Sequence, residues 1–196
     1  MRDNMIKVDN LTKAFDGKAV LNGVNTEFSD GIYMLTGPSG SGKTTFARIL
    51  GRLETPDSGT ISGPGAVSFM FQEPRLFPWM NLRSNIVSVT DCSRQVADEL
   101  LTELELYNDR SKLPGELSGG MQRRAALART LSAKADLYIF DEPLSGLDDK
   151  LKRTACDIIR RWISGGKTAL IITHDISEVS EIADHHLKLE NGKITE

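Results

Sequence analysis

The stretch that decides the fold is IYMLTGPSGSGKT, residues 32–44, where a short apolar run is followed by three glycines, a lysine and a threonine. Residues 37–44 match the pattern GxxxxGK[ST]. We expect a strand over Ile32–Leu35 and a helix from Lys43 to about Leu53, so that backbone amides converge on a polyphosphate. The alternative is a glycine-rich turn that caps a helix. The strand before the loop and the helix after it favour phosphate binding.

Within this loop the glycines permit the close backbone approach that a side chain would block. The lysine is expected to reach the β and γ phosphates of a nucleotide, and the hydroxyl of Thr44 to ligate Mg²⁺. The nucleotide-binding residues predicted here are Gly37, Pro38, Ser39, Gly40, Ser41, Gly42, Lys43, Thr44 and Thr45.

A second motif supplies two carboxylates. The apolar run Leu137–Phe140 is followed directly by Asp141 and Glu142. The carboxyl ends of parallel strands are where ligands bind in open α/β sheets, so Asp141 is expected to hold Mg²⁺ and Glu142 to polarise the attacking water. A strand that ends in a solvated acidic turn is the alternative, and the phosphate loop argues against it.

The remaining sequence alternates short apolar runs with helical patterns, which is typical of an α/β domain with a mainly parallel sheet. Apolar residues at helical spacing fill residues 83–107 without a strand nearby, and they predict a helical insert. Another helix is expected from Gly119 through Leu131. The expected strands are Ile6–Val8, Asn25–Phe28, Ile32–Leu35, Val67–Phe71, Leu137–Phe140, Ala169–Thr173 and His186–Leu189.

Length and composition indicate one globular domain. The chain has 196 residues, of which 39% are hydrophobic and 26% charged, and a net charge of −3. Cys92 and Cys156 have no metal-site or redox spacing, so reduced thiols in a cytoplasmic protein are expected. The longest apolar runs are far shorter than the roughly 20 residues of a membrane span, and the N-terminus lacks a secretory signal. Without a basic block, nucleic acid is not an expected partner.

A third motif, Ser118-Gly119-Gly120, predicts a second anion-binding helix end, with the serine as N-cap. One nucleotide rarely needs two such ends in one chain. We therefore expect two copies to face head to tail, each nucleotide lying between Lys43 of one copy and Ser118 of the other. A simple N-cap followed by flexible glycines is the alternative.

Together these motifs resemble the ATP-binding cassette (ABC) ATPases, and the resemblance covers nearly the whole chain. It implies a P-loop NTPase fold: a mainly parallel central sheet, a small peripheral antiparallel β portion and an inserted α-helical subdomain. Residues 1–196 would form one domain, with a RecA-like core of about 1–72 and 119–196 and a helical insert of about 73–118. ATP and Mg²⁺ would be the ligands.

The resemblance also assigns roles to the motif residues. Gln72 would sense Mg²⁺ and γ-phosphate, His174 would contact γ-phosphate and hold Glu142 in register, and Phe15 would stack on adenine where the family usually has tyrosine. The signature motif Ser118–Gln122 would supply nucleotide contacts, and Asp148 would cross a dimer interface. The catalytic residues predicted are Glu142, His174, Gln72 and Lys43, the metal-binding residues Thr44, Gln72 and Asp141, and the further nucleotide contacts Phe15, Gln72, Ser118, Gly119, Gly120, Gln122 and Asp148.

Each of these roles has a plainer alternative. Gln72 can be a solvated amide at a strand end, and His174 can cap a helix beside Asp175. Phe15 can be a core residue, and Asp148 can begin the next helix.

The run FQEPRLFPWM, residues 71–80, resembles the nitrate, sulfonate, taurine and bicarbonate importers within the family. Two prolines should expose a rigid apolar loop, and exposed apolar patches mark partner surfaces. An integral membrane permease would bind near Phe77–Trp79, a solute-binding protein would act indirectly, and the chain would lie on the inner face of the membrane. The alternative is that Phe77 and Trp79 pack under the helical insert.

One departure from the family concerns the segment between Lys43 and Gln72, which are 29 positions apart. Residues Gly59–Gly65 are expected to form a compressed turn, which would leave a trimmed antiparallel sheet.

Three functions remain open at this point. The first is the ATPase subunit of a transporter, which the motifs favour. The second is a soluble ABC-type ATPase in DNA repair, translation or iron–sulfur assembly, and the third a P-loop kinase or a non-hydrolysing nucleotide-binding protein. The second class usually carries coiled coils, tandem cassettes or basic arms, and none occurs in this sequence.

Overall fold

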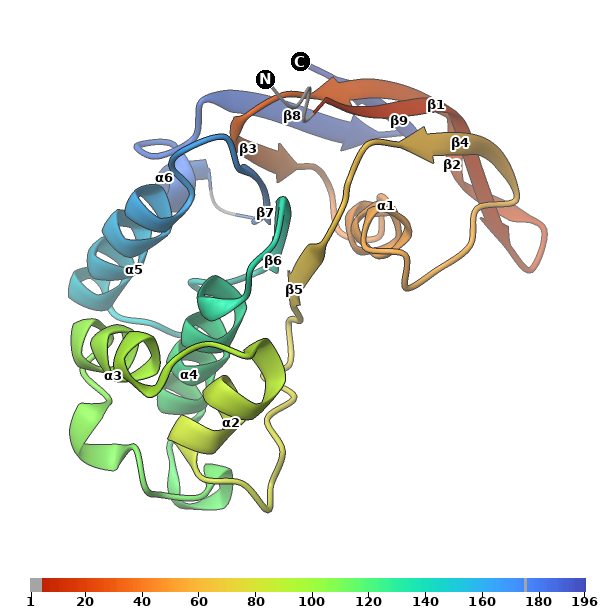
Figure 1. The fold of residues 1–196 in the computed structure, drawn as a ribbon. Coiled ribbons are helices and arrows are strands. Elements are labelled where there is room, and N and C mark those ends of the chain that lie inside the picture. Colours follow the sequence, from red (N-terminus) through yellow and green to blue (C-terminus); the bar gives the residue numbers. More distant parts are fainter. Residues whose placement is uncertain (1–4, 175) are drawn as a thin grey trace.

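The computed structural model describes residues 5–174 and 176–196, and it has two sheets with helices packed around the larger one (Figure 1). The position of Asp175 lies outside the described residues. The strands are β1 (Ile6–Phe15), β2 (Lys18–Phe28), β3 (Gly31–Thr36), β4 (Ser58–Ser62), β5 (Val67–Met70), β6 (Leu137–Asp141), β7 (Thr168–Ile172), β8 (His185–Glu190) and β9 (Lys193–Thr195). The α-helices are α1 (Lys43–Leu50), α2 (Leu82–Thr90), α3 (Arg94–Glu103), α4 (Gly119–Ser132), α5 (Asp149–Trp162) and α6 (Ile176–Val179), and two 3₁₀ turns span Tyr107–Asp109 and Pro114–Glu116.

The larger sheet has the strand order β5-β6-β7-β3-β8-β9. All its pairings are parallel except that of β8 with β9. Every residue of β6 and β7 is buried, as expected for strands that are covered on both faces. The sequence prediction of a mainly parallel α/β sheet is therefore confirmed.

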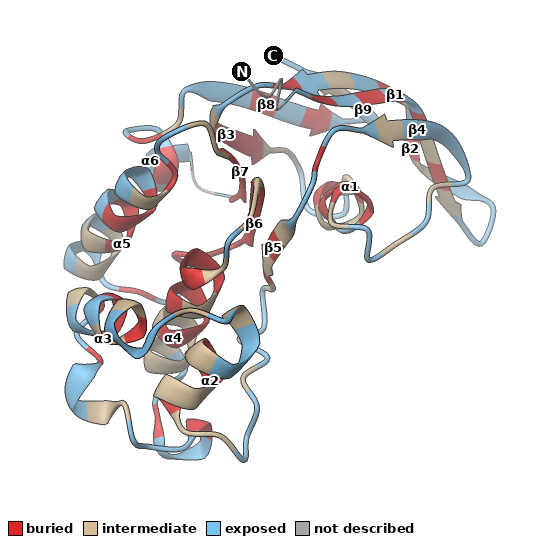
Figure 2. Cartoon of the chain, viewed as in Figure 1, coloured by how far each residue is buried: buried red, intermediate tan, exposed pale blue. Residues whose placement is uncertain are grey.

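The two faces of this sheet pack against different partners. One face packs against a core that also contains the buried apolar residues of α2 to α5. The sheet residues in this core include Met34, Tyr138, Phe140, Ala169 and Ile171. Their neighbours Leu35, Ile139, Leu170 and Ile172 face a second core, formed with α1 and the smaller sheet. Buried positions are accordingly concentrated where helices and sheets meet (Figure 2).

The smaller sheet is antiparallel, with the order β2-β1-β4. A small antiparallel portion was predicted and is confirmed, but the predicted strand bounds were too short, because β1 and β2 are much longer than Ile6–Val8 and Asn25–Phe28. Register shifts between Val8 and Leu11 and between Leu11 and Lys13 break the alternation of buried and exposed residues on β1, which hides the strand from a period-2 pattern. An Asp16-Gly17 turn with positive φ at both residues joins the two strands.

The segment after α1 also differs from the prediction. Residues 58–62 form β4, which pairs antiparallel with β1, where a compressed turn over Gly59–Gly65 was expected. Gly59 has φ +90, and an added Cβ would lie 2.5 Å from the Asn10 carbonyl oxygen, so β4 can pass β1 closely only with glycine there. The helix before it ends at Leu50, short of the expected Leu53, because Gly51 terminates it.

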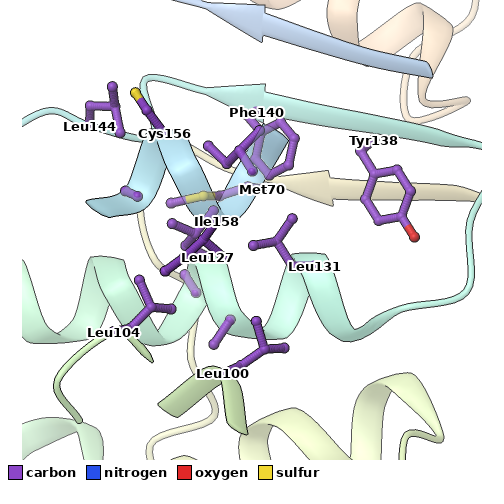
Figure 3. Packing of buried hydrophobic residues seen from close by; sticks show 14 of the residues in the cluster. Met70, Leu100, Leu104, Leu127, Leu131, Tyr138, Phe140, Leu144, Cys156 and Ile158 are labelled. Carbon is purple, nitrogen blue, oxygen red and sulfur yellow. The ribbon is translucent and has the colours of Figure 1, made fainter. Parts of the chain in front are cut away.

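Helices α2, α3 and α4 pack together at the end of the molecule far from the small sheet (Figure 1). Leu127 and Leu131 of α4 point toward Met70 and Phe140 of the sheet, while Leu100 and Leu104 approach from the side of α3 (Figure 3). Helix α4 thus joins the helical segment to the parallel sheet. The described residues contain no helix long and apolar enough to cross a membrane.

We predict that Leu127→Ala lowers the free energy of unfolding by about 2–5 kcal/mol, because the fully buried side chain leaves a cavity between α4 and the sheet. Urea denaturation measures the change. The control is Leu113→Ala, which removes a leucine that is 42% exposed and should change stability by no more than about 0.5 kcal/mol. Equal losses in the two variants would contradict the packing described here.

Candidate active site

Three neighbouring strands end at one edge of the large sheet and bring the predicted motifs together. Strand β3 leads into the glycine-rich loop and α1, β6 ends at Asp141, and β7 is followed by Thr173 and His174. A cavity of about 340 Å³ opens at this edge. It is lined by Val20, Ser39, Gly40, Gly42, Lys43, Thr44, Thr45, Gln72, Asp141, Glu142, Ile172 and His174.

The shape of the loop depends on its glycines. Gly37 has φ +148, and an added Cβ would lie 2.2 Å from the carbonyl oxygen of Leu189 on β8. Gly42, with φ +102, comes just before α1 and would place a Cβ 2.7 Å from Val20 Cγ1. Both contacts are far too short for a side chain, so these two glycines let the loop fold against β2 and β8.

Lys43 is buried at the first position of α1. Its Nζ donates hydrogen bonds to the carbonyl oxygens of Gly37 (2.8 Å) and Pro38 (2.9 Å). Burial lowers the pKa of Lys43, and the nearby Glu142 and Asp141 oppose that shift. The buried Ser41 Oγ has no hydrogen-bond partner among the described residues. An ammonium group and a helix N-terminus suit a ligand that carries phosphate oxygens.

The next pair consists of oxygen donors. Thr44 Oγ1 donates a hydrogen bond to Asp141 Oδ2 at 3.1 Å, although the two residues are 97 positions apart in the sequence. Burial raises the pKa of Asp141, while the Thr44 hydrogen bond and the positive charges of Arg48 and Lys43 act in the opposite direction. A hydroxyl and a carboxylate in contact match the oxygen ligands that Mg²⁺ prefers, so these residues fit the predicted ion.

The second carboxylate has a constrained backbone. Glu142 is buried and has φ +56, in the left-handed region that residues other than glycine rarely adopt. Its amide donates a hydrogen bond to the Ile172 carbonyl oxygen at 3.0 Å, and its Oε1 lies 3.0 Å from His174 Nε2. The Glu142 backbone is therefore fixed against the end of β7, and the His174 imidazole lies beside the carboxylate.

The other predicted site residues lie outside this cavity. Ser118 Oγ accepts a hydrogen bond from the Met121 amide as the N-cap of α4, and Asp148 Oδ1 accepts one from the Leu151 amide as the N-cap of α5. Gln122, on α4, donates hydrogen bonds from its side-chain amide to the Pro114 and Leu117 carbonyl oxygens in the segment just before the helix. Gly119 and Gly120 begin α4. Within one chain, the signature residues and Asp148 thus make structural contacts and do not line the cavity.

Phe15 is also separate from the cavity lining. Its side chain is 45% exposed at the end of β1, and Lys13 Nζ lies 5.1 Å from the centre of its ring. This exposure contradicts the alternative that Phe15 is a core residue. Its stacking on adenine stays a prediction.

Two arginines of α4 contact the site region, and the sequence did not single them out. Arg123 Nη1 donates to the Glu142 carbonyl oxygen at 3.1 Å. Arg129 donates to the carbonyl oxygens of Pro74 and Arg75, both at 2.9 Å, just after Gln72. Both arginines donate to backbone atoms of segments that are distant in the sequence, and no local sequence pattern predicts such contacts.

Comparison with known proteins agrees with this geometry. The profile described as "ABC transporter" matches residues 21–145. The chain belongs to the ABC transporter ATPase family. It is 35% identical to the arginine transport ATP-binding protein ArtM of Bacillus subtilis, over 98% of this chain and 90% of ArtM. It is 40% identical to the aliphatic sulfonates import ATP-binding protein SsuB 1 of Pseudomonas fluorescens, over 95% of this chain and 73% of that protein.

A solved structure of an ABC cassette, MJ0796, has the same fold. Its dimeric post-hydrolysis state, bound to ADP and Pi, superposes with a TM-score of 0.88 at 26% identity and covers 97% of both chains. The resemblance drawn from the motifs and the predicted fold class are therefore confirmed, and this ABC protein is an ATPase.

We predict that Arg123→Gln lowers kcat for ATP hydrolysis about three- to tenfold with little change in KM. The variant loses the guanidinium contact to the backbone of Glu142, and one hydrogen bond of this kind contributes about 0.5–1.5 kcal/mol. Arg123→Lys keeps a donor and should recover part of the rate. Steady-state ATPase assays measure both constants.

The matched control is Arg153→Gln, which changes an exposed arginine on α5 and should leave kcat unchanged. A wild-type kcat in Arg123→Gln, or an equal loss in the control, would show that the Arg123 contact does not position Glu142.

Proposed function

We propose that this chain is the ATP-hydrolysing subunit of an ABC importer, in which two copies bind two Mg·ATP and drive a separate membrane permease. The observation that carries the proposal is the cavity that joins Lys43, Thr44, Asp141 and Glu142 at one sheet edge. The importer assignment is supported by the relatives, which are named as arginine transport, aliphatic sulfonates import and sulfate/thiosulfate import ATP-binding proteins. A small organic solute or an oxyanion is the proposed class of cargo.

The residues of the cavity would have different roles in ATP hydrolysis. The loop amides and Lys43 would bind the phosphates, and Thr44 and Asp141, with Gln72 beside them, would hold Mg²⁺, which would neutralise charge on the phosphates. Glu142 takes a proton from the attacking water at its carboxylate, and His174, 3.0 Å from Glu142 Oε1, keeps that carboxylate in position.

A second copy would complete each site. Ser118, Gly119 and Gly120 form an exposed end of α4, a helix of 14 residues whose N-terminus favours an anion. They do not line the cavity of their own chain, and the solved MJ0796 cassette is dimeric. We therefore propose a head-to-tail dimer in which these residues and Asp148 approach the nucleotide of the partner copy.

The permease is proposed to bind at Phe77 and Trp79. Their side chains are 36% and 70% exposed, which contradicts the alternative that they pack under the insert. The fully buried Asn85 holds this loop: its Oδ1 accepts from the Phe77 amide at 2.7 Å, and its Nδ2 donates to the Phe77 and Met80 carbonyl oxygens. A rigid loop with two exposed aromatic side chains suits a protein partner.

In the proposed arrangement the chain would lie at the inner face of the membrane, and a solute-binding protein would act only through the permease. We also propose that the chain divides into a core of about 1–72 and 119–196 and a helical insert of about 73–118.

The second candidate function is that of a soluble ABC-type ATPase. The import proteins among the relatives favour the importer subunit.

We predict that Glu142→Gln lowers the ATP hydrolysis rate at least about 100-fold, because an amide cannot accept the proton of the attacking water. ATP binding should persist, so the variant should accumulate as an ATP-bound dimer in size-exclusion chromatography. Glu190→Gln, which changes an exposed glutamate on β8, serves as the control. Equal hydrolysis by Glu142→Gln and wild-type protein would contradict the role of Glu142.

We predict that Trp79→Ala weakens copurification with the membrane permease while ATP hydrolysis by the isolated chain stays within twofold of wild type. The side chain is the most exposed of the large apolar residues described and lies outside the nucleotide cavity. Val89→Ala removes another exposed apolar side chain, on α2, and should leave copurification unchanged. Full permease capture by Trp79→Ala would place the interface elsewhere.

A further inference from the structure

The helical segment contains a second polar cavity, of about 380 Å³, that shares no lining residue with the nucleotide cavity. Its charged and hydroxyl-bearing lining residues are Arg83, Arg94, Arg110, Ser84, Ser88 and Ser111. An asparagine and a valine complete the lining, which includes no carboxylate. Three arginines in the lining of one cavity stand out in a chain whose net charge is −3.

Two of these arginines already contact other residues through their guanidinium groups. Arg83 donates from Nε and Nη2 to the two carboxylate oxygens of Asp98, at 2.7 and 2.8 Å. Arg110 donates from Nη1 to the Tyr107 carbonyl oxygen at 2.8 Å, and its Cζ lies 4.1 Å from the centre of the Tyr107 ring. Each guanidinium keeps further N–H donors, and holding it in place reduces the entropy lost when a ligand binds.

The third arginine is different. The side chain of Arg94, the first residue of α3, makes no hydrogen bond or ion pair with any residue that the structure describes. Since Asp98 neutralises Arg83, the lining keeps the positive charges of Arg94 and Arg110. Two positive charges match the charge of one phosphate group.

From this lining we infer that the cavity binds a phosphate group, either of a small soluble molecule or of a lipid headgroup. Guanidinium forks and serine hydroxyls are the donors that phosphate oxygens accept, and the volume falls in the range of pockets that hold small ligands. Neither the nucleotide site nor its catalytic residues take part in this second cavity.

Hydrogen bonds connect the lining of this cavity to the loop that we propose as the permease contact. Asn81, which lines the cavity, caps α2 by accepting the Ser84 amide at Oδ1, and its carbonyl oxygen accepts from Asn85 Nδ2. Asn85 is the residue that holds Phe77 and Met80. A bound phosphate would thereby stabilise this loop; only this consequence rests on the proposed function.

The test is a titration of inorganic phosphate into the full chain, with Mg²⁺ and a non-hydrolysable ATP analogue filling the nucleotide loop, followed by calorimetry. We expect one phosphate site in the wild-type chain, binding at least about tenfold weaker in Arg94→Ala, and close to wild-type binding in Arg94→Lys. Lys193→Ala, an equal charge change at an exposed position on β9, is the control. A parallel arm measures binding to phosphatidylcholine vesicles with and without phosphatidylglycerol.

Loss of phosphate binding in Arg94→Ala alone would support a soluble phosphate ligand. Binding only to phosphatidylglycerol vesicles, with the same dependence on Arg94, would support a lipid headgroup. No binding in either arm, or binding that Arg94→Ala and Lys193→Ala change equally, would overturn the inference. None of these outcomes depends on ATP hydrolysis or transport, so the proposed function can fail while this inference stands, and the reverse also holds.

Discussion

The parallel pairing of β7 with both β3 and β6 is the constraint on which the site depends. Ile172, the last residue of β7, lies opposite Leu35 of β3 on one side and Asp141 of β6 on the other. This shared register sets the phosphate loop and the two carboxylates at the same level of the sheet. The Ile172 carbonyl oxygen also accepts a hydrogen bond from the Glu142 amide, so β7 directly fixes the backbone of Glu142, which has a positive φ.

Helix α4 extends this arrangement to the rest of the molecule through three arginines that donate to carbonyl oxygens. Arg123 reaches Glu142, Arg124 reaches Leu104 at the end of α3, and Arg129 reaches the segment after Gln72. The apolar side chains of the same helix pack into the large core. A displacement of the Ser118 end of α4 would therefore change the arginine contacts to Glu142, to the end of α3 and to the loop before Phe77.

The parts predicted well from the sequence are those whose signal is local. The loop at residues 37–44 and the Asp141-Glu142 pair each follow a short apolar strand, and the carboxyl ends of parallel strands lie at the same edge of the sheet, with β7 between these two. The long hairpin of β1 and β2 was missed because bulges disturb its alternation. Arg123, Arg129 and Asn85 act on backbone atoms from a distance along the chain or inside a loop, and residue type alone does not reveal such contacts.

We propose that each nucleotide is bound between the phosphate loop of one copy and the Ser118 end of α4 of another copy. It is tested most directly by disulfide trapping in chains in which Cys92 and Cys156 are replaced by serine, mixing Ser39→Cys with Ser118→Cys. Both serines are exposed, and they lie on the two faces that would meet. We predict that the mixture of the two variants forms a disulfide-linked dimer in the presence of ATP and that neither variant forms it alone. A mixture that stays monomeric with ATP, or that cross-links equally without it, would contradict the shared site.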